Sequence, residues 1–235
     1  MTILLVAATL PEVRPLLDAL GPHTTGPHTT TAAARLQHLA TPSGTRVDLL
    51  VTGVGVVATA TWCARALAAR PYDVALNVGV CGSFAPAFPP GTVVHVVSEQ
   101  LPELGAEDGD TFLPLQQLGL LGEDEDPWRG GRLRCATPPA NAVLAALPQA
   151  HGITVNCAHG DEASIARLLA RLSPDVESME GAAFMYACLT AGVPFAQVRA
   201  VSNVVERRNR AAWQLGPAIA NLTAVTRRLL DSAWT

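Results

Sequence analysis

The chain has 235 residues, with 16 basic and 20 acidic side chains and a formal net charge of −4. All the basic residues are arginine, and the absence of lysine excludes Schiff-base enzymes, pyridoxal phosphate enzymes and P-loop NTPases, which need a lysine amine. Charged residues make up 15% and apolar residues 49%, which argues against intrinsic disorder and against a nucleic-acid partner held by surface charge.

Short apolar segments predict strands, and longer segments between them predict helices. Most strand segments are continuously apolar, as in strands covered on both faces. Their alternation predicts one α/β domain over residues 1–235, with three layers around a mostly parallel or mixed sheet. In chain order, the expected strands are 3–8, 47–51, 74–80, 92–97, 153–156 and 195–201, and the expected helices are 11–20, 56–69, 165–172, 182–191 and 210–233.

Two segments are expected to be irregular. Residues 21–31, GPHTTGPHTTT, are rich in Gly, Pro and Thr and predict a surface loop. Residues 101–131 carry the acidic runs EDGD and EDEDP and predict a long excursion with little core of its own. Its acidic cluster is more typical of a solvated surface than of a metal site.

Targeting and cofactor signals are weak. No run of 18 apolar residues occurs, so we expect no transmembrane helix and no membrane partner. The N-terminal segment lacks a basic region before its apolar run and predicts a buried strand, not a signal peptide. The five cysteines are scattered without C-x-x-C spacing, which favours a cytoplasmic protein without a zinc site. We expect neither a metal nor an organic cofactor.

The segment VTGVGVVA at residues 51–58 matches the G-x-G-x-x-A fingerprint of dinucleotide-binding proteins. Such a turn lets backbone N–H groups approach a phosphate at a helix N-terminus. The fingerprint also requires an acid at the end of the next strand, but here the only acid, Asp73, stands at its beginning. We therefore favour a tight turn that lets the following helix pack closely on the sheet.

Glu12 follows the first expected strand and allows two interpretations. Residues 9–12, TLPE, fit a capping box at a helix start, which is the favoured interpretation of this segment alone. In the other, the carboxylate lies at the carboxyl edge of the sheet, where α/β proteins bind ligands, and serves as a general base.

Glu180 and Asn203 are similarly ambiguous. Glu180 precedes an apolar helix, where it could complement the helix dipole or accept hydrogen bonds from the vicinal hydroxyls of a sugar beside Gly181. Asn203 ends the last expected strand, where Asn is common in turns. Its amide could also read a base edge with both a donor and an acceptor.

Taken together, these segments resemble the nucleoside phosphorylase/nucleosidase superfamily over nearly the whole chain. The resemblance implies a three-layer α/β/α sandwich around a mixed sheet, a small-molecule purine nucleoside as substrate, and a homodimer or larger homo-oligomer. It rests on Glu12 after the first strand and on four motifs in order: TGVGVVATA at 52–60, NVGVCGSFAP at 77–86, SMEGAA at 178–183 and VPFAQVRAVSN at 193–203.

The resemblance also implies roles for individual residues. Glu12 corresponds to the base that activates water, and Met179 and Glu180 correspond to the pair that binds ribose. Gly82 matches the loop beside the base, while Arg199 and Ser202 match residues that support the geometry of the site. Phe112 is a candidate for the wall of the 5′ pocket, from the same subunit or across a dimer interface. The expected purine-stacking phenylalanine has no counterpart, because HGDEAS at 159–164 has Ala163 in its place; Phe84 could compensate.

One departure concerns the leaving base. Adenine-cleaving members carry aspartate where this chain has Asn203, whereas a 6-oxopurine presents two acceptors, N7 and O6, that suit an amide donor. The segment SNVVERRNRAAW at 202–213 also resembles the branch of this superfamily that hydrolyses futalosine. Futalosine is a 6-oxopurine nucleoside that carries a ketone-linked benzoate on its 5′ side. Because the chain has no lysine, Arg207, Arg208 and Arg210 are the candidates for binding that carboxylate.

Three alternatives stay open at this point. A phosphorolytic enzyme of the same fold could act on inosine or guanosine, but Glu12 would repel the phosphate. A methylthioadenosine or S-adenosylhomocysteine nucleosidase would cleave adenine. A non-catalytic nucleoside-binding protein would bind the substrate without releasing the base.

Overall fold

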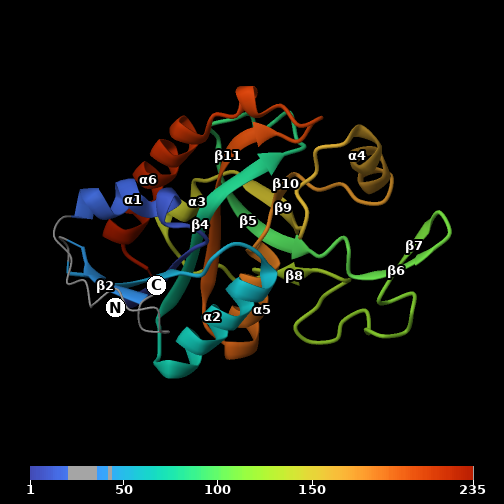
Figure 1. Cartoon of the computed structure of the whole chain (residues 1–235). Helices are drawn as coiled ribbons and strands as arrows, with labels where there is room; N and C mark the ends of the chain where they lie inside the picture. Colours follow the sequence, from blue (N-terminus) through green and yellow to red (C-terminus); the bar gives the residue numbers. More distant parts are fainter. Residues whose placement is uncertain (21–35, 42–43, 235) are drawn as a thin grey trace.

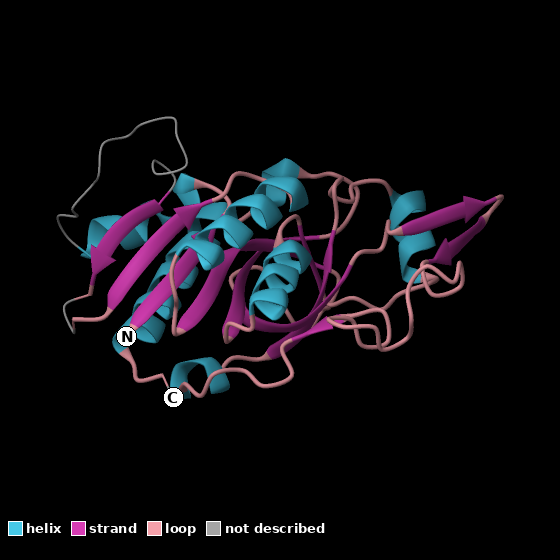
Figure 2. Cartoon of the chain, turned by 90° about the horizontal axis from the view of Figure 1, so that it is seen from below, coloured by secondary structure: helices cyan, strands magenta, loops and turns pink. Residues whose placement is uncertain are grey.

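The computed structural model describes residues 1–20, 36–41 and 44–234 (Figure 1). Its centre is a mixed sheet of nine strands, in the order β10-β9-β5-β11-β4-β1-β3-β2 with β8 paired to β5. A separate hairpin, β6–β7, projects from one end (Figures 1 and 2). The strands are β1 (Thr2–Ala7), β2 (Leu36–Ala40), β3 (Arg46–Val51), β4 (Val74–Ser83), β5 (Val93–Gln100), β6 (Gly105–Asp108), β7 (Thr111–Pro114), β8 (Leu133–Arg134), β9 (Gln149–Thr154), β10 (Val176–Ser178) and β11 (Phe195–Val204).

Half of the sheet closes on itself. The short strand β10 pairs in parallel with β9 and antiparallel with β4, so that β4, β11, β5, β9 and β10 form a ring. The strands β1, β3 and β2 extend from β4 as an open sheet. Because β1, β4 and β11 run parallel, their carboxyl ends meet at one edge, where α/β proteins bind ligands.

Helices cover both faces of this sheet, as Figure 1 shows. Alternate residues of β1 point to opposite faces: Ile3 and Leu5 pack in the core under α1 and α6, whereas Leu4 and Val6 pack in the core under α2 and α5. This double burial explains why the strand segments are continuously apolar. The helices are α1 (Leu10–Leu20), α2 (Val56–Ala69), α3 (Ala142–Ala145), α4 (Glu162–Leu169), α5 (Gly181–Ala191) and α6 (Leu215–Asp231).

The predicted α/β/α architecture around a mixed sheet is confirmed, with differences in detail. The predicted helix 210–233 is two elements, a 3₁₀ turn η2 (Arg210–Ala212) and α6. The excursion 101–131 contains the hairpin β6–β7, and its Trp128 is buried in the main core. The predicted loop 21–31 lies outside the described residues. Among the residues described, no helix is long and apolar enough to cross a membrane.

Candidate active site

A cavity of about 370 Å³ lies at the carboxyl ends of β1, β4 and β11. Seven of the predicted site residues line it: Glu12, Gly82, Met179, Glu180, Ser202, Asn203 and Arg208. They come from segments far apart in the chain, which the sheet edge and the starts of α1 and α5 bring together. Other lining residues are Ala8, Thr9, Pro11, Val54, Val80, Cys81, Val155, Ala158, His159, Glu177, Ser178, Trp213, Leu215 and Ile219.

Glu12 has the contacts of a capping residue and also lies at the carboxyl edge of the sheet; its role as a general base stays a prediction. Its Oε2 accepts hydrogen bonds from the Thr9 backbone N–H at 2.9 Å and from the Thr9 hydroxyl at 2.7 Å, as in a capping box. Its Oε1 accepts from the Val80 N–H at 3.1 Å, at the end of β4. The same carboxylate also lines the cavity. The hydrogen bonds at the start of α1 therefore fix the orientation of a carboxylate that faces the cavity.

Glu180 begins α5 but does not cap it, since its side chain accepts no hydrogen bond from that helix. Instead, Oε1 accepts from the Gly55 N–H at 3.1 Å, and Oε2 lies 3.8 Å from Nη1 of Arg199. Gly53 and Gly55 have φ angles of 90° and 94°. The glycine turn before α2 thus directs an N–H group at the carboxylate of Glu180, which occupies the place of the phosphate in the dinucleotide fingerprint.

Arg199 lies in the core beneath the cavity and does not line it. It is fully buried and donates from Nη2 to Oδ1 of Asn77 at 2.6 Å. Its Nε and Nη1 have no hydrogen-bond partner among the described residues. A side chain at Gly79 would overlap Nη1 and lie 2.9 Å from Oε1 of Glu12, so this glycine makes room for the guanidinium between the two carboxylates.

Gly82 and Asn203 form the floor of the cavity, where β4 pairs with β11. A Cβ atom at Gly82 would lie 3.3 Å from Nδ2 of Asn203, so the amide stands directly beside the glycine. The Ser202 Oγ lies 2.9 Å from Oδ1 of Asn203 and 3.1 Å from the Cys81 carbonyl oxygen, so these two acceptors share its hydrogen, while Nδ2 of Asn203 donates to the Val204 carbonyl. This arrangement leaves an N–H of the amide for a ligand.

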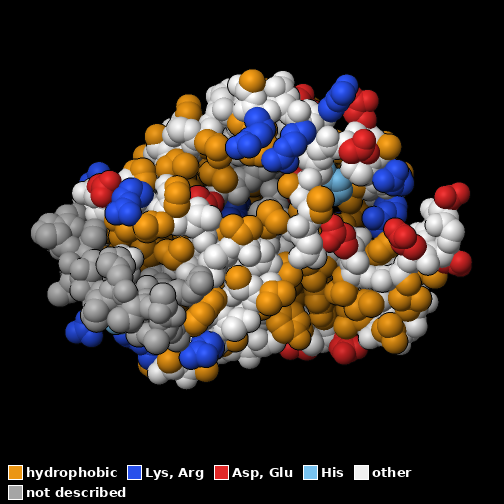
Figure 3. Space-filling model, viewed as in Figure 1, with side chains coloured by type: hydrophobic (Ala, Val, Ile, Leu, Met, Phe, Trp, Pro, Cys, Tyr) orange, Lys and Arg blue, Asp and Glu red, His pale blue; other side chains and the backbone are white. Residues whose placement is uncertain are grey.

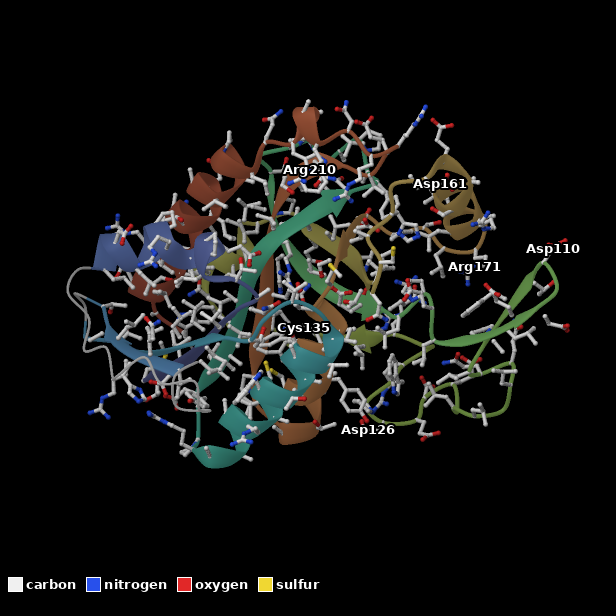
Figure 4. All side chains as sticks on the ribbon, in the orientation of Figure 1. Asp110, Asp126, Cys135, Asp161, Arg171 and Arg210 are labelled. Atoms are coloured by element: carbon white, nitrogen blue, oxygen red, sulfur yellow. The ribbon has the colours of Figure 1, made fainter. Side chains whose placement is uncertain are left out.

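Three predicted ligand-binding residues, Phe112, Arg207 and Arg210, do not line this cavity in the described chain. Phe112 is on β7, in a second cavity of about 410 Å³ beside the hairpin, where Arg171 stacks 4.2 Å from its ring centroid. Arg207 does not line the main cavity, and neither does Arg210, which Figure 4 places near the upper end of β11. Of the three candidate arginines, Arg208 alone lines it.

Sequence reasoning missed the aromatic groups of the site. Trp213 lines the cavity, and the guanidinium carbons of Arg208 and Arg210 lie 5.4 and 5.9 Å from its ring centroid. Phe84 does not line the cavity and packs against the ring of His159 at 6.2 Å between centroids. Trp213 lies nine residues after Val204, the end of β11, and no local sequence pattern reveals the direction of its side chain, because η2 and the turn before α6 set it.

The missed polar residues are His159 and Glu177. The imidazole Nδ1 lies 2.7 Å from Oε2 of Glu177, and the His159 N–H donates to Oε1 at 3.1 Å. Burial raises the pKa of Glu177, and its hydrogen bonds with His159 oppose that effect. The sequence signal that could have identified Glu177 is its position three residues before Glu180.

A further carboxyl group lies beneath the cavity. Glu99 is 1% exposed, and it accepts hydrogen bonds from Nε2 of Gln197 at 2.7 Å and from the Thr154 hydroxyl at 2.9 Å. Burial raises its pKa to about 7, against the effect of these hydrogen bonds. Thr154 in turn accepts from the Ala182 N–H at 2.7 Å, so this network holds the first turn of α5.

Among the described residues, no group of acids, histidines and cysteines has the arrangement of a metal site.

Known proteins share this architecture. A methylthioadenosine/S-adenosylhomocysteine nucleosidase from Colwellia psychrerythraea, solved with adenine, superposes with a TM-score of 0.80 at 19% identity, covering 100% of this chain and 98% of that one. The native futalosine hydrolase of Helicobacter pylori gives a TM-score of 0.78 at 13% identity, covering 98% and 97%. At such identities the likeness shows the fold alone.

Sequence relatives are more specific. The futalosine hydrolase of Streptomyces coelicolor is 37% identical over 194 residues, 77% of each chain. That of Acidothermus cellulolyticus is 35% identical over 233 residues, 97% of this chain and 88% of the relative. The profile of the phosphorylase superfamily matches residues 2–231, and the predicted resemblance is thus confirmed. The chain belongs to the phosphorylase superfamily and, within it, to the family of the futalosine hydrolases.

Proposed function

We propose that the chain hydrolyses the N-ribosidic bond of futalosine, releasing hypoxanthine and dehypoxanthine futalosine in menaquinone biosynthesis. The observation that carries the proposal is the amide of Asn203 beside Gly82, in one cavity with Glu12 and Glu180. Nδ2 donates one N–H to the Val204 carbonyl, and its second N–H is available to the base. This donor matches the acceptors N7 and O6 of a 6-oxopurine, whereas adenine presents an exocyclic amine, itself a donor, in the place of O6.

The reaction divides between the two ends of the base–sugar bond. The C–N bond breaks ahead of water attack, its electron pair goes to the base, and positive charge develops on the ribose ring. Asn203 stabilises the departing hypoxanthine at N7 by hydrogen bonding. Glu180 accepts hydrogen bonds from the ribose hydroxyls and lies near the positive charge, with Met179 beside the sugar. Glu12 orients the water and takes its proton as the new C–O bond forms.

Charges in the cavity favour water over phosphate as the nucleophile. Glu12, Glu177 and Glu180 all line it, whereas the buried guanidinium of Arg199 already faces Glu180 and Asn77. A phosphate dianion near Glu12 would meet carboxylate charge at short range. This electrostatic repulsion supports hydrolysis over phosphorolysis.

The same cavity suggests a place for the benzoate of the substrate. Arg208 and Trp213 lie together on its wall, and Leu215 and Ile219 of α6 add apolar surface. Arginine binds carboxylates through two parallel N–H groups, and an indole face stacks on an aryl ring. We therefore assign the carboxylate to Arg208, in preference to Arg207 and Arg210.

We further propose that the enzyme works as a homodimer or larger assembly. Hydrophobic side chains gather on the face shown in Figure 3, between α2 and the loop that follows β7. Val57, Leu120 and Tyr186 are large hydrophobic residues exposed by 78%, 70% and 44%. An apolar patch of this kind is typical of an interface. Phe112, remote from the cavity of its own chain, could then line the 5′ pocket of a neighbouring subunit.

Incubation with futalosine, inosine and methylthioadenosine, each with and without phosphate, tests the proposed reaction. We expect phosphate-independent release of hypoxanthine from futalosine. Phosphate-dependent release of hypoxanthine from inosine would instead identify a phosphorylase. Binding of futalosine without release of free base would identify a non-catalytic nucleoside-binding protein.

A further inference from the structure

The cavity contains a histidine–carboxylate pair that the proposed mechanism does not use. His159 and Glu177 both line the cavity, and their side chains are 14% and 7% exposed. The carboxylate accepts from both the ring and the backbone of His159, at 2.7 and 3.1 Å. Phe84 packs edge-on against the imidazole, at an interplanar angle of 69°. These contacts hold the ring in one orientation.

The strand register places this pair across the cavity floor from Asn203. Gly82 on β4 is in register with Glu177 on β10 and with Asn203 on β11. A Cβ atom at Gly82 would lie 3.5 Å from Cγ of Glu177 and 3.3 Å from Nδ2 of Asn203. Gly82 therefore stands between the amide on one side and the histidine–carboxylate pair on the other, and a base bound in the cavity that all of them line would meet both.

The carboxylate determines which imidazole nitrogen is available. With Glu177 as the acceptor, Nδ1 of His159 carries the hydrogen that it donates, which selects the Nδ1–H tautomer of the imidazole. The lone pair is then on Nε2, which has no hydrogen-bond partner among the described residues. The pair thus offers an acceptor to the cavity, whereas Asn203 offers a donor.

We propose that His159 accepts a hydrogen bond from N1–H of the 6-oxopurine through Nε2, with Glu177 as the positioning residue. The inference rests on the proposed function and adds a second element of base selection to it. When the amide of Asn203 donates to N7, N1–H lies on the neighbouring edge of the purine, next to O6, and we place this edge towards the pair. N1 of hypoxanthine carries a hydrogen, whereas N1 of adenine carries a lone pair that would repel the lone pair of Nε2. Base selectivity then arises at two positions.

Base binding tests this inference without requiring turnover. Hypoxanthine and 1-methylhypoxanthine are titrated calorimetrically into the wild-type chain and into His159→Phe, which keeps a flat ring but removes the acceptor. We expect the wild type to bind hypoxanthine at least about 10-fold more tightly than the methylated base. We expect His159→Phe to lose about 10- to 100-fold in hypoxanthine affinity while its affinity for 1-methylhypoxanthine stays unchanged.

Two further variants separate base reading from structure. Glu177→Gln should weaken hypoxanthine binding less than His159→Phe does, because its carbonyl can still accept the Nδ1 proton. Asp161→Asn is the matched control: this residue caps α4 two positions after His159, lies outside the cavity, and should leave both affinities unchanged.

The inference is overturned if the wild type binds both bases equally, or not at all, or if His159→Phe binds hypoxanthine as tightly as the wild type. Failure of the proposed reaction is a separate result, seen as intact futalosine in the turnover assay.

Discussion

Replacing Glu12 by Gln separates the structural use of this carboxylate from its chemical use. Glutamine keeps one carbonyl oxygen for the Thr9 N–H at the start of α1, as capping boxes allow. The NH₂ group of the glutamine then takes the place of Oε1, which accepts from the Val80 N–H at 3.1 Å in the wild type. The Val80 N–H therefore loses its acceptor. An unsatisfied backbone N–H costs about 1–2 kcal/mol. For a chain of this size that corresponds to a fall in Tm of about 2–8 °C, so the variant should remain folded.

Activity should fall much further than stability. An amide cannot take the proton of the attacking water, and loss of a general base typically reduces kcat about 10²- to 10⁴-fold. This corresponds to about 3–5 kcal/mol of transition-state free energy. The assay is chromatographic measurement of hypoxanthine released from futalosine at saturating substrate, with thermal unfolding measured on the same sample.

Glu125→Gln provides the control for Glu12→Gln. Its carboxylate also accepts a backbone hydrogen bond, from the Gly122 N–H at 3.0 Å, but it lies outside the cavity. Its kcat should be that of the wild type. Near-normal turnover by a folded Glu12→Gln protein would remove Glu12 as the base and leave it with its capping role alone.

Three other changes test the base site and the network beneath it. Asn203→Asp should reduce futalosine turnover at least about 10-fold and improve cleavage of adenine nucleosides, because an aspartic acid suits N7 beside an exocyclic amine; unchanged substrate preference would contradict this. Gly82→Ala should raise KM for futalosine, because the new methyl group would lie 2.8 Å from Cγ2 of Val205 and 3.3 Å from Nδ2 of Asn203 and would displace these side chains; an unchanged KM would exclude the base from this place. Glu99→Gln should flatten the pH dependence of stability. The pKa of Glu99 is raised from 4.5 to about 7, so the stability that its proton contributes is lost as pH rises through this interval. Urea unfolding at pH 5 and pH 8 measures the difference, and an equally steep loss in the variant would exclude Glu99 as its source.

The architecture was predictable because strands that are buried on both faces of the sheet have a continuously apolar sequence. The segments that became β1, β4 and β11 are continuously apolar, and each was expected within a few residues of its observed bounds. The short strand β10 was missed, since three residues carry no period. Its pairing with both β9 and β4 is a long-range event that closes the ring, and no local property of residues 176–178 specifies it.

The candidate site was predictable where a residue stood at the end of a strand or the start of a helix. Glu12, Glu180 and Asn203 have such positions, and the structure gathers all three around one cavity. His159 was not identified, because its position depends on a hydrogen bond to Glu177 from another segment. Phe112 was assigned by loose alignment within an excursion, and the hairpin β6–β7 carries it away from the cavity of its own chain.

The carboxylates of Glu12 and Glu180 each accept a backbone hydrogen bond at a helix start and also line the cavity, and this combination has a physical consequence. An unpaired helix N-terminus offers N–H groups in fixed directions, and a carboxylate bound to them has little freedom to reorient. Glu12 accepts from the Thr9 N–H at the start of α1, and Glu180 accepts from the Gly55 N–H at the start of α2. Charge that develops on a ribose ring is stabilised most by groups that need no reorganisation. In the proposed reaction, the helix starts that fix these two carboxylates would therefore also hold them in place for the transition state.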